Sequence, residues 1–88
     1  MSEIEPRVRS VVAIHLDVES DRLRPDARLG EDLCVDSLAA TELAMVLEDE
    51  FDIALPEEAL GCVRTFGDVV TLVQERVEIR RHAADAPA

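Results

Sequence analysis

The sequence predicts a small all-α protein: a four-helix bundle with three longer helices, one short helix and a long loop between the first two. Three observations predict this fold. Apolar residues recur at helical spacing in three separate stretches, no stretch alternates as a strand would, and 88 residues suffice for one domain. Because only Phe51 and Phe66 are aromatic, the core must consist mainly of Leu, Val, Ile and Ala.

The first helix is expected over residues 3–16, where one apolar face repeats at helical spacing. That face consists of Ile4, Val8, Val11, Val12 and Leu16. Residues 17–36 contain several Asp, a Pro and a Gly without a helical period, which predicts a loop. A loop of this length must be either functional or disordered, and spaced leucines favour an ordered one. The expected anchors are Leu23, Leu29 and Leu33.

The second helix is expected from Ser37 to about Phe51, with two different faces. The core face consists of Leu43, Ala44, Leu47 and Phe51. The other face mixes acidic and apolar residues, namely Leu38, Glu42, Met45 and Asp49. A mixed face of this kind predicts contact with solvent or with a partner.

Two further helices complete the bundle. Pro56 begins a short one of one or two turns, limited by Gly61, with Leu55, Ala59 and Val63 facing inward. Thr65 and Asp68 fit a capping box for the last helix, which should end near Ile79 or Arg80. Its apolar face consists of Phe66, Val69, Val70, Val73 and Val77. The domain is therefore expected over residues 1–80, with residues 81–88 as a flexible tail.

The charge is unevenly distributed and narrows the possible functions. The net charge is −11, and between Arg28 and Arg64 there are ten acidic residues and no basic one. Such a field repels nucleic acid and anionic membranes and attracts basic partners. Two cysteines form no disulfide framework, the N-terminus has no signal-peptide pattern, and no apolar run reaches membrane-spanning length. We therefore expect a monomeric, soluble, cytoplasmic protein that neither binds nucleic acid nor inserts into membranes.

Ser37 is the candidate for chemistry, and three roles are open to it. As a helix cap, its oxygen would accept a backbone N–H, contributing about 1 kcal/mol. As a nucleophile it would need a nearby base, but the two histidines are His15 in the first helix and His82 in the predicted tail, and no G-x-S-x-G surrounds it. As an attachment point, it would place an esterified phosphate at a helix N-terminus, which favours anions.

A metal site is not expected. The acidic residues lack the calcium-loop pattern, with no glycine at its sixth position, and the spacing of His and Cys does not suit zinc.

The stretch EDLCVDSLAATELAMVLEDEFDIALPEEAL closely resembles acyl carrier proteins of fatty acid and polyketide synthesis. The core motif is Asp36-Ser37-Leu38, and its context makes the resemblance specific. That context consists of Glu31-Asp32-Leu33, Glu42-Leu43, Leu47-Glu48, Glu50-Phe51 and Pro56. The resemblance extends into the first and last helices and covers residues 3–79.

The resemblance implies a non-catalytic carrier of acyl thioesters. A 4′-phosphopantetheine arm would be attached to Ser37, with Asp36 and Leu38 beside it, by a separate phosphopantetheinyl transferase that uses coenzyme A and magnesium. Acyl-transferring and synthase enzymes with basic patches would then dock on the second helix. The residues implied for docking are Leu38, Glu42, Met45, Glu48 and Asp49. An acyl chain could enter a pocket lined by Val46, Leu47, Leu55, Ala59 and Val63.

The sequence also departs from the family pattern and leaves two alternatives open. Cys34 stands where glycine is common, which would strain a backbone that needs positive φ, although a loop that simply accepts a small side chain is the favoured interpretation. Cys62 is expected at the core or its boundary. One alternative is an acidic interaction module without a prosthetic group; the other is an aminoacyl or peptidyl carrier, although that class more often has Gly-Gly-x-Ser before the second helix.

Overall fold

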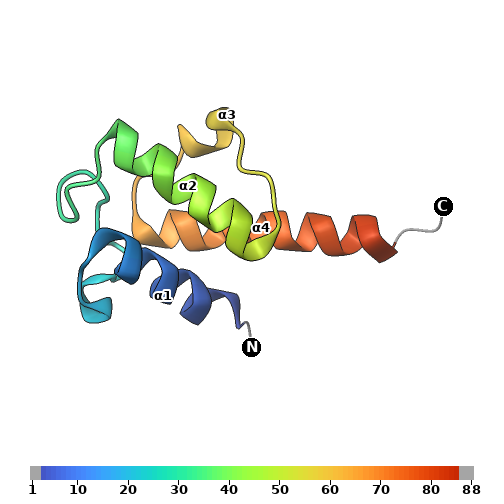
Figure 1. Ribbon diagram of the computed structural model, residues 1–88, viewed down its shortest axis with the longest axis horizontal. Helices are drawn as coiled ribbons and strands as arrows, with labels where there is room; N and C mark the ends of the chain where they lie inside the picture. Colours follow the sequence, from blue (N-terminus) through green and yellow to red (C-terminus); the bar gives the residue numbers. More distant parts are fainter. Residues whose placement is uncertain (1–2, 86–88) are drawn as a thin grey trace.

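A computed structural model describes the backbone of residues 3–85 and the side chains of residues 3–81. The element order is α1 (Ile4–Leu16), a 3₁₀ turn η1 (Ser20–Arg22), α2 (Ser37–Phe51), α3 (Glu57–Leu60) and α4 (Phe66–Asp85). Helix α1 packs against α2 and α4, and α2 packs against α4, while the short α3 lies beside α2 (Figure 1). The expected all-α four-helix bundle is confirmed.

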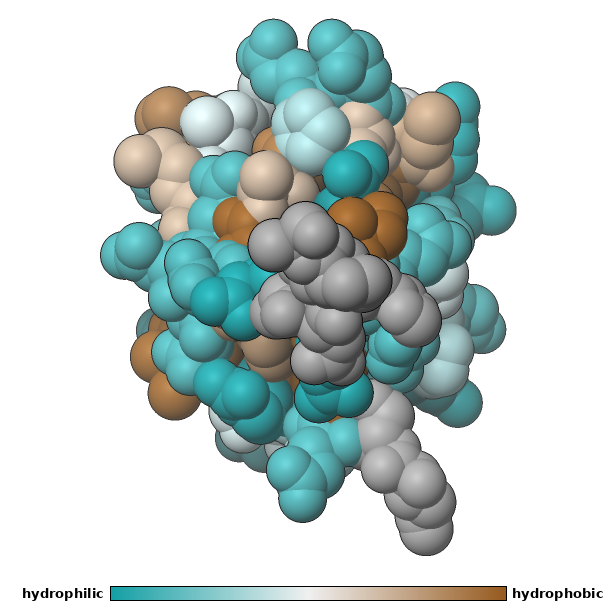
Figure 2. Space-filling model, turned by 90° about the vertical axis from the view of Figure 1, so that its right-hand side faces the viewer, coloured by the Kyte–Doolittle hydropathy of each residue, from teal (hydrophilic) through white to brown (hydrophobic). Residues whose placement is uncertain are grey.

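The core is aliphatic, as the near absence of aromatic residues predicts. Each long helix buries the face that its periodicity indicates: Ile4, Val8 and Val12 from α1; Leu43, Ala44 and Leu47 from α2; and Phe66, Val69, Val70 and Val73 from α4. The exterior at the C-terminal end of α4 is mostly hydrophilic, with hydrophobic residues scattered among hydrophilic ones (Figure 2). The burial of these stripes, at about 25 cal/mol per Å² of apolar area, is what holds the helices together.

The long loop before α2 is held in place by hydrogen bonds from α1 and by leucines that pack into the core. Arg9 of α1 donates hydrogen bonds to the carbonyl oxygens of Ser20 (2.9 Å) and Leu23 (2.6 Å) and also pairs with Glu5. The side chains of Leu23 and Leu33 are buried, whereas Leu29 is half-buried. These three leucines are the expected anchors, and their burial explains why the loop follows a defined path.

The loop is also joined to the start of α4. Arg28 and Thr65 form an isolated antiparallel bridge, in which Leu29 N–H donates to the Arg64 carbonyl (3.0 Å). Two residues after Thr65, the Gly67 N–H donates to the Pro25 carbonyl oxygen at 2.9 Å. Since this loop leads directly into α2, these bonds position the start of α2 relative to α4.

The capping box at the start of α4 forms as expected. Asp68 N–H donates to the Thr65 hydroxyl (3.2 Å), and Thr65 N–H donates to Asp68 Oδ2 (3.1 Å). Asp68 Oδ2 also accepts the Arg64 N–H at 3.0 Å. These hydrogen bonds, with the Arg64 N–H as the largest cause, hold the pKa of the Asp68 carboxyl below its usual value.

The expected end of the last helix near Ile79 or Arg80 is wrong, because α4 continues to Asp85. The segment from 80 to 85 consists of Arg, His, Ala and Asp, contains no helix breaker, and is followed by a proline only at position 87. Arg80 also pairs with Asp52, which ties this part of α4 to the end of α2. Residues 81–85 therefore extend the helix, whereas residues 86–88 of the expected tail lie outside the described residues.

Candidate functional site

The start of α2 assigns different roles to Asp36 and Ser37. Asp36 has extended backbone angles and is the N-cap, because its Oδ1 accepts the Ala39 N–H at 2.8 Å. Ser37 is the first helical residue; its backbone carbonyl accepts the Thr41 hydroxyl, and its own side chain is exposed. The cap role expected for Ser37 therefore belongs to Asp36, since only a residue with non-helical φ and ψ can turn its side chain back onto the first N–H groups.

The Ser37 hydroxyl makes no hydrogen bond with any described residue, so no base or acid restrains it. His15 lies in the last turn of α1, and the side chain of His82 lies outside the described residues. A hydroxyl without a base is a poor nucleophile by itself. It is, however, open to an external enzyme that brings its own base.

An open groove lies beside Ser37, between the start of α2 and the segment that precedes α4. Its rim is polar and includes Arg28, Glu31, Asp36 and Arg64. Its floor is apolar and is formed by Leu29, Val35, Ala40 and Val63.

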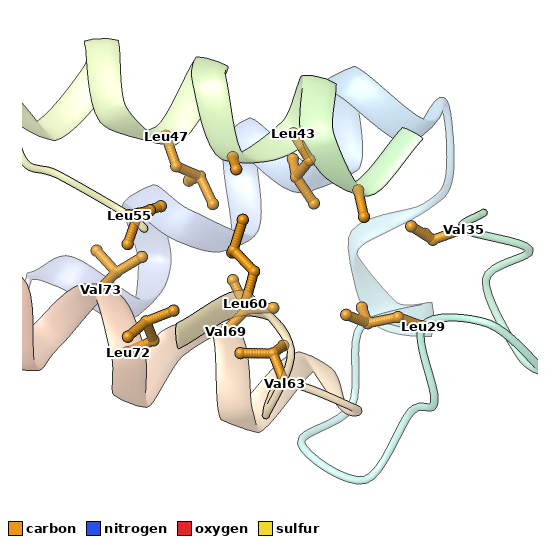
Figure 3. A pocket seen from close by; sticks show the side chains of 12 residues that line it. Leu29, Val35, Leu43, Leu47, Leu55, Leu60, Val63, Val69, Leu72 and Val73 are labelled. Atoms are coloured by element: carbon orange, nitrogen blue, oxygen red, sulfur yellow. The ribbon is translucent and has the colours of Figure 1, made fainter. Parts of the chain in front are cut away.

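An apolar cavity of about 60 Å³ lies in the interior between α2, α3 and α4. Figure 3 shows side chains from α2, α4 and the loops pointing into it. The lining residues are all aliphatic: Leu29, Val35, Ala40, Leu43, Ala44, Leu47, Leu55, Leu60, Val63, Val69, Leu72 and Val73. The four residues of the groove floor belong to this lining as well. The groove beside Ser37 therefore leads to the cavity across a shared apolar surface.

The residues expected to line a pocket are only partly brought together here. Leu47, Leu55 and Val63 line the cavity, but Val46 and Ala59 do not. Val46 precedes Leu47, and one residue of α-helix rotates a side chain by about 100°, so Val46 faces outward and is 36% exposed. In α3 the lining residue is Leu60 instead of Ala59.

Several cavity residues were missed by the sequence reasoning. Leu29 and Val35 belong to a loop without periodicity, and only the fold brings them to α2. Leu72 was detectable, because it follows Val69 at helical spacing.

The mixed face of α2 is open to solvent, as its pattern predicts. Leu38 is 68% exposed and Met45 is 62% exposed, and the side chains of Glu42 and Asp49 are also exposed. Glu48 differs from them, because it is half-buried and its Oε2 accepts the Leu55 N–H at 2.9 Å. Glu48 therefore stabilises the connection between α2 and α3, a role that the sequence reasoning did not include.

The cysteines also depart from expectation. Cys34 has a φ of 58°, so the interpretation that this position merely accepts a small side chain is wrong and the strained alternative holds. Cys62 is exposed and free, not part of the core, because it follows the short α3 and Gly61 on the surface.

Comparison with known proteins agrees with this geometry. The family described as "Phosphopantetheine attachment site" matches residues 6–73. The chain is also 42% identical over 77 residues to a protein of Phenylobacterium zucineum (strain HLK1) named "Acyl carrier protein". That match covers 88% of this chain and 98% of the relative.

The chain belongs to the acyl carrier protein family. Its prosthetic group is 4′-phosphopantetheine, and members of the family are carriers that interact with a transferase and with synthase enzymes. The serine at the start of α2 and the groove beside it fit such a group. The Ser37 hydroxyl is exposed and has no hydrogen bond with a described residue, and the groove beside it has both cationic and apolar surfaces.

No helix in the described part of the chain is both long and apolar enough to cross a lipid bilayer. No three His, Cys, Asp or Glu side chains in the described part of the chain are grouped so that they could hold a metal ion.

Proposed function

We propose that Ser37 carries the 4′-phosphopantetheine arm and that the protein holds acyl groups as thioesters for biosynthetic enzymes of fatty acid, lipid or polyketide synthesis. The observation that carries this proposal is the Ser37 hydroxyl, which is exposed and makes no hydrogen bond with the described residues, because Asp36 caps the helix. The group supplies a terminal thiol. The protein itself displays the serine, accommodates the acyl chain and presents a docking surface, so no catalysis is assigned to it.

Attachment can be tested by intact-mass measurement after incubation with coenzyme A, Mg²⁺ and a phosphopantetheinyl transferase. We expect the wild type to gain the mass of one phosphopantetheine and Ser37→Ala to gain nothing. Ser10→Ala is the matched control, because Ser10 is an exposed serine of α1 that lies in no groove with Ser37. A wild type that stays unmodified would favour the alternative of an interaction module without a prosthetic group.

The cavity supports the further proposal that the protein shields its acyl chain. An apolar cavity holds water poorly, and about 10–15 Å³ of such space accommodates one water-sized group. The cavity must therefore widen for a chain of eight carbons. Its walls consist of aliphatic side chains alone, and these repack around a guest at lower cost than locked aromatic rings.

Methyl NMR spectra of the octanoylated and unacylated proteins test the shielding. We expect the methyl resonances of Leu47, Leu55 and Val63 to shift, since all three line the cavity. Val46 is an internal control, because it lies on α2 but faces outward. Equal, small changes at Val46 and at the lining residues would show that the acyl chain stays in solvent.

We also propose that basic partners dock on the mixed face of α2, through Leu38, Glu42, Met45 and Asp49. Glu48 contributes to this docking surface in addition to its hydrogen bond with Leu55. Exposed apolar side chains among carboxylates give a partner both contact area and long-range attraction. Truncating Leu38 or Met45 to Ala should weaken association with the transferase severalfold while leaving stability within about 0.5 kcal/mol. Ile14→Ala is the control, because Ile14 is 81% exposed on α1.

A further inference from the structure

Two arginines line the groove beside Ser37, and they differ in what they contact. The Arg28 guanidinium donates to Glu31 at 2.8 Å and is therefore already paired. The Arg64 guanidinium makes no hydrogen bond or ion pair with a described residue. Arg64 is thus an uncommitted cation on the rim of the groove, in a protein of net charge −11.

The backbone holds Arg64 firmly in this place. Its N–H donates to Asp68 Oδ2 (3.0 Å), and its carbonyl accepts the Leu29 N–H (3.0 Å). The positive charge of Arg64 is a minor cause of the lowered pKa of the Asp68 carboxyl. Because Asp68 Oδ2 already accepts two backbone N–H groups, the Arg64 side chain is left for another anion.

We propose that Arg64 binds the phosphodiester through which the arm is joined to Ser37, and so holds the base of the arm in the groove. This inference rests on the proposed attachment to Ser37. The planar guanidinium forms paired, charge-assisted hydrogen bonds with phosphate oxygens, which an ammonium group does not match. Asp36 and Glu31 also line the groove and repel a phosphate there, so a cation on the opposite rim offsets that repulsion.

Holding the base of the arm in the groove has a consequence for the acyl chain. The floor of the groove and the wall of the cavity share Leu29, Val35, Ala40 and Val63. Arg64 therefore favours a retracted arm that leads toward the cavity over an arm extended into solvent. Since Arg64 is exposed, its hold on the phosphodiester weakens as salt rises.

The test compares holo wild type with holo Arg64→Gln by ³¹P NMR, together with the side-chain Nε–Hε resonances of arginine. We expect the ³¹P resonance of Arg64→Gln to move from the wild-type position toward that of a free phosphodiester. In the wild type, the Arg64 Nε–Hε resonance should shift on conversion of apo to holo protein. At 1 M NaCl, where the Debye length is about 3 Å, the wild-type ³¹P resonance should move to the Arg64→Gln position.

Arg24→Gln is the matched control. It removes the same charge from an exposed arginine that does not line the groove, so its ³¹P spectrum should superimpose on that of the wild type. Apo melting temperatures check that each variant is folded. A wild type that gains no mass overturns both the attachment and this inference. If mass is gained but the ³¹P resonances of wild type and Arg64→Gln coincide, the inference alone is overturned.

Discussion

Cys34 occupies a backbone conformation that its side chain disfavours. Within residues 3–85, three non-glycine residues have positive φ: Asp17, Cys34 and Asp52. Asp17 and Asp52 are the C-caps of α1 and α2, where a short polar side chain tolerates the left-handed region. Cys34 ends no helix and has an exposed side chain, so neither a cap nor burial compensates for its strain.

Replacing Cys34 by glycine should therefore stabilise the protein. The left-handed conformation costs a non-glycine residue about 1–2 kcal/mol, while glycine loses about 0.5–1 kcal/mol in backbone entropy. We expect a net gain of about 0.5–1 kcal/mol in the free energy of unfolding, measured with urea on the apo protein. Cys62→Gly is the control: this exposed cysteine lacks positive φ and should only lose stability. A loss at both positions would contradict the strain argument.

Asp68 makes part of the stability depend on pH. Its pKa is lowered in the folded protein, chiefly by the Arg64 N–H. A lowered folded pKa contributes stability above the unfolded pKa of about 3.9, and that stability is lost as pH falls through the folded value. The melting temperature of the wild type should thus exceed that of Asp68→Asn at pH 6, and the difference should shrink as the pH is lowered below 4. A difference that does not change with pH would contradict this account.

At the scale of elements, the helices follow from local sequence while the site depends on distant contacts. Periodicity predicts α1, α2 and the start of α4, because the apolar residues of a buried helix face recur at helical spacing in the local sequence. It does not predict the end of α4, where Arg80 pairs with Asp52 across the fold. Nor does it predict that Leu29 and Val35 reach the cavity, or that Glu48 holds Leu55, since each contact joins two separate segments.

Ser37 shows the same division at the site. The motif and its spacing identified the serine, but from the sequence a cap role was considered for Ser37 alone, and only the backbone angles show that Asp36 is the N-cap. The positive φ of Cys34 was likewise only a conditional expectation, since φ is set by the path of the loop.

The junction between the loop and α4 depends on the absence of a side chain at Gly67. A Cβ there would lie 2.8 Å from the Pro25 carbonyl oxygen, which accepts the Gly67 N–H. Gly67→Ala must displace that backbone, and overpacking of this kind costs about 1–3 kcal/mol. The better helix propensity of Ala offsets up to about 1 kcal/mol, so we expect a net loss of about 1–2 kcal/mol in urea unfolding.

Gly61→Ala is the control for this prediction. Gly61 has a φ of −62°, and a Cβ there would meet its nearest atom at 3.6 Å, which is ordinary contact. Alanine should therefore stabilise the protein by about 0.4–1 kcal/mol, because it lowers the conformational entropy of the unfolded chain. Equal effects at the two glycines would show that the close approach to Pro25 is unimportant.

At the scale of the whole molecule, the acidic charge has opposite effects on folding and on docking. Five ion pairs connect arginines to carboxylates in the described chain, and all are exposed except the half-buried Arg9–Glu5 pair. An exposed pair contributes only about 0–1 kcal/mol. Glu42 and Asp49, on the proposed docking face, are exposed and have no ion pair with a described residue. The excess of eleven negative charges remains after pairing, and its self-repulsion destabilises the compact state.

Salt should therefore stabilise the protein while weakening its association with partners. Between 0.01 M and 0.5 M NaCl we expect the melting temperature to rise by about 5–10 °C, corresponding to about 1–2 kcal/mol for a domain of this size. Over the same range the association rate with the transferase should fall, because screening removes the long-range attraction. The double variant Glu42→Gln/Asp49→Asn should melt higher than the wild type at low salt, show a smaller rise with salt, and associate more slowly. If salt lowered both the melting temperature and the association rate, the five ion pairs would outweigh the repulsion, and the acidic face would be a source of stability instead of a surface kept for docking.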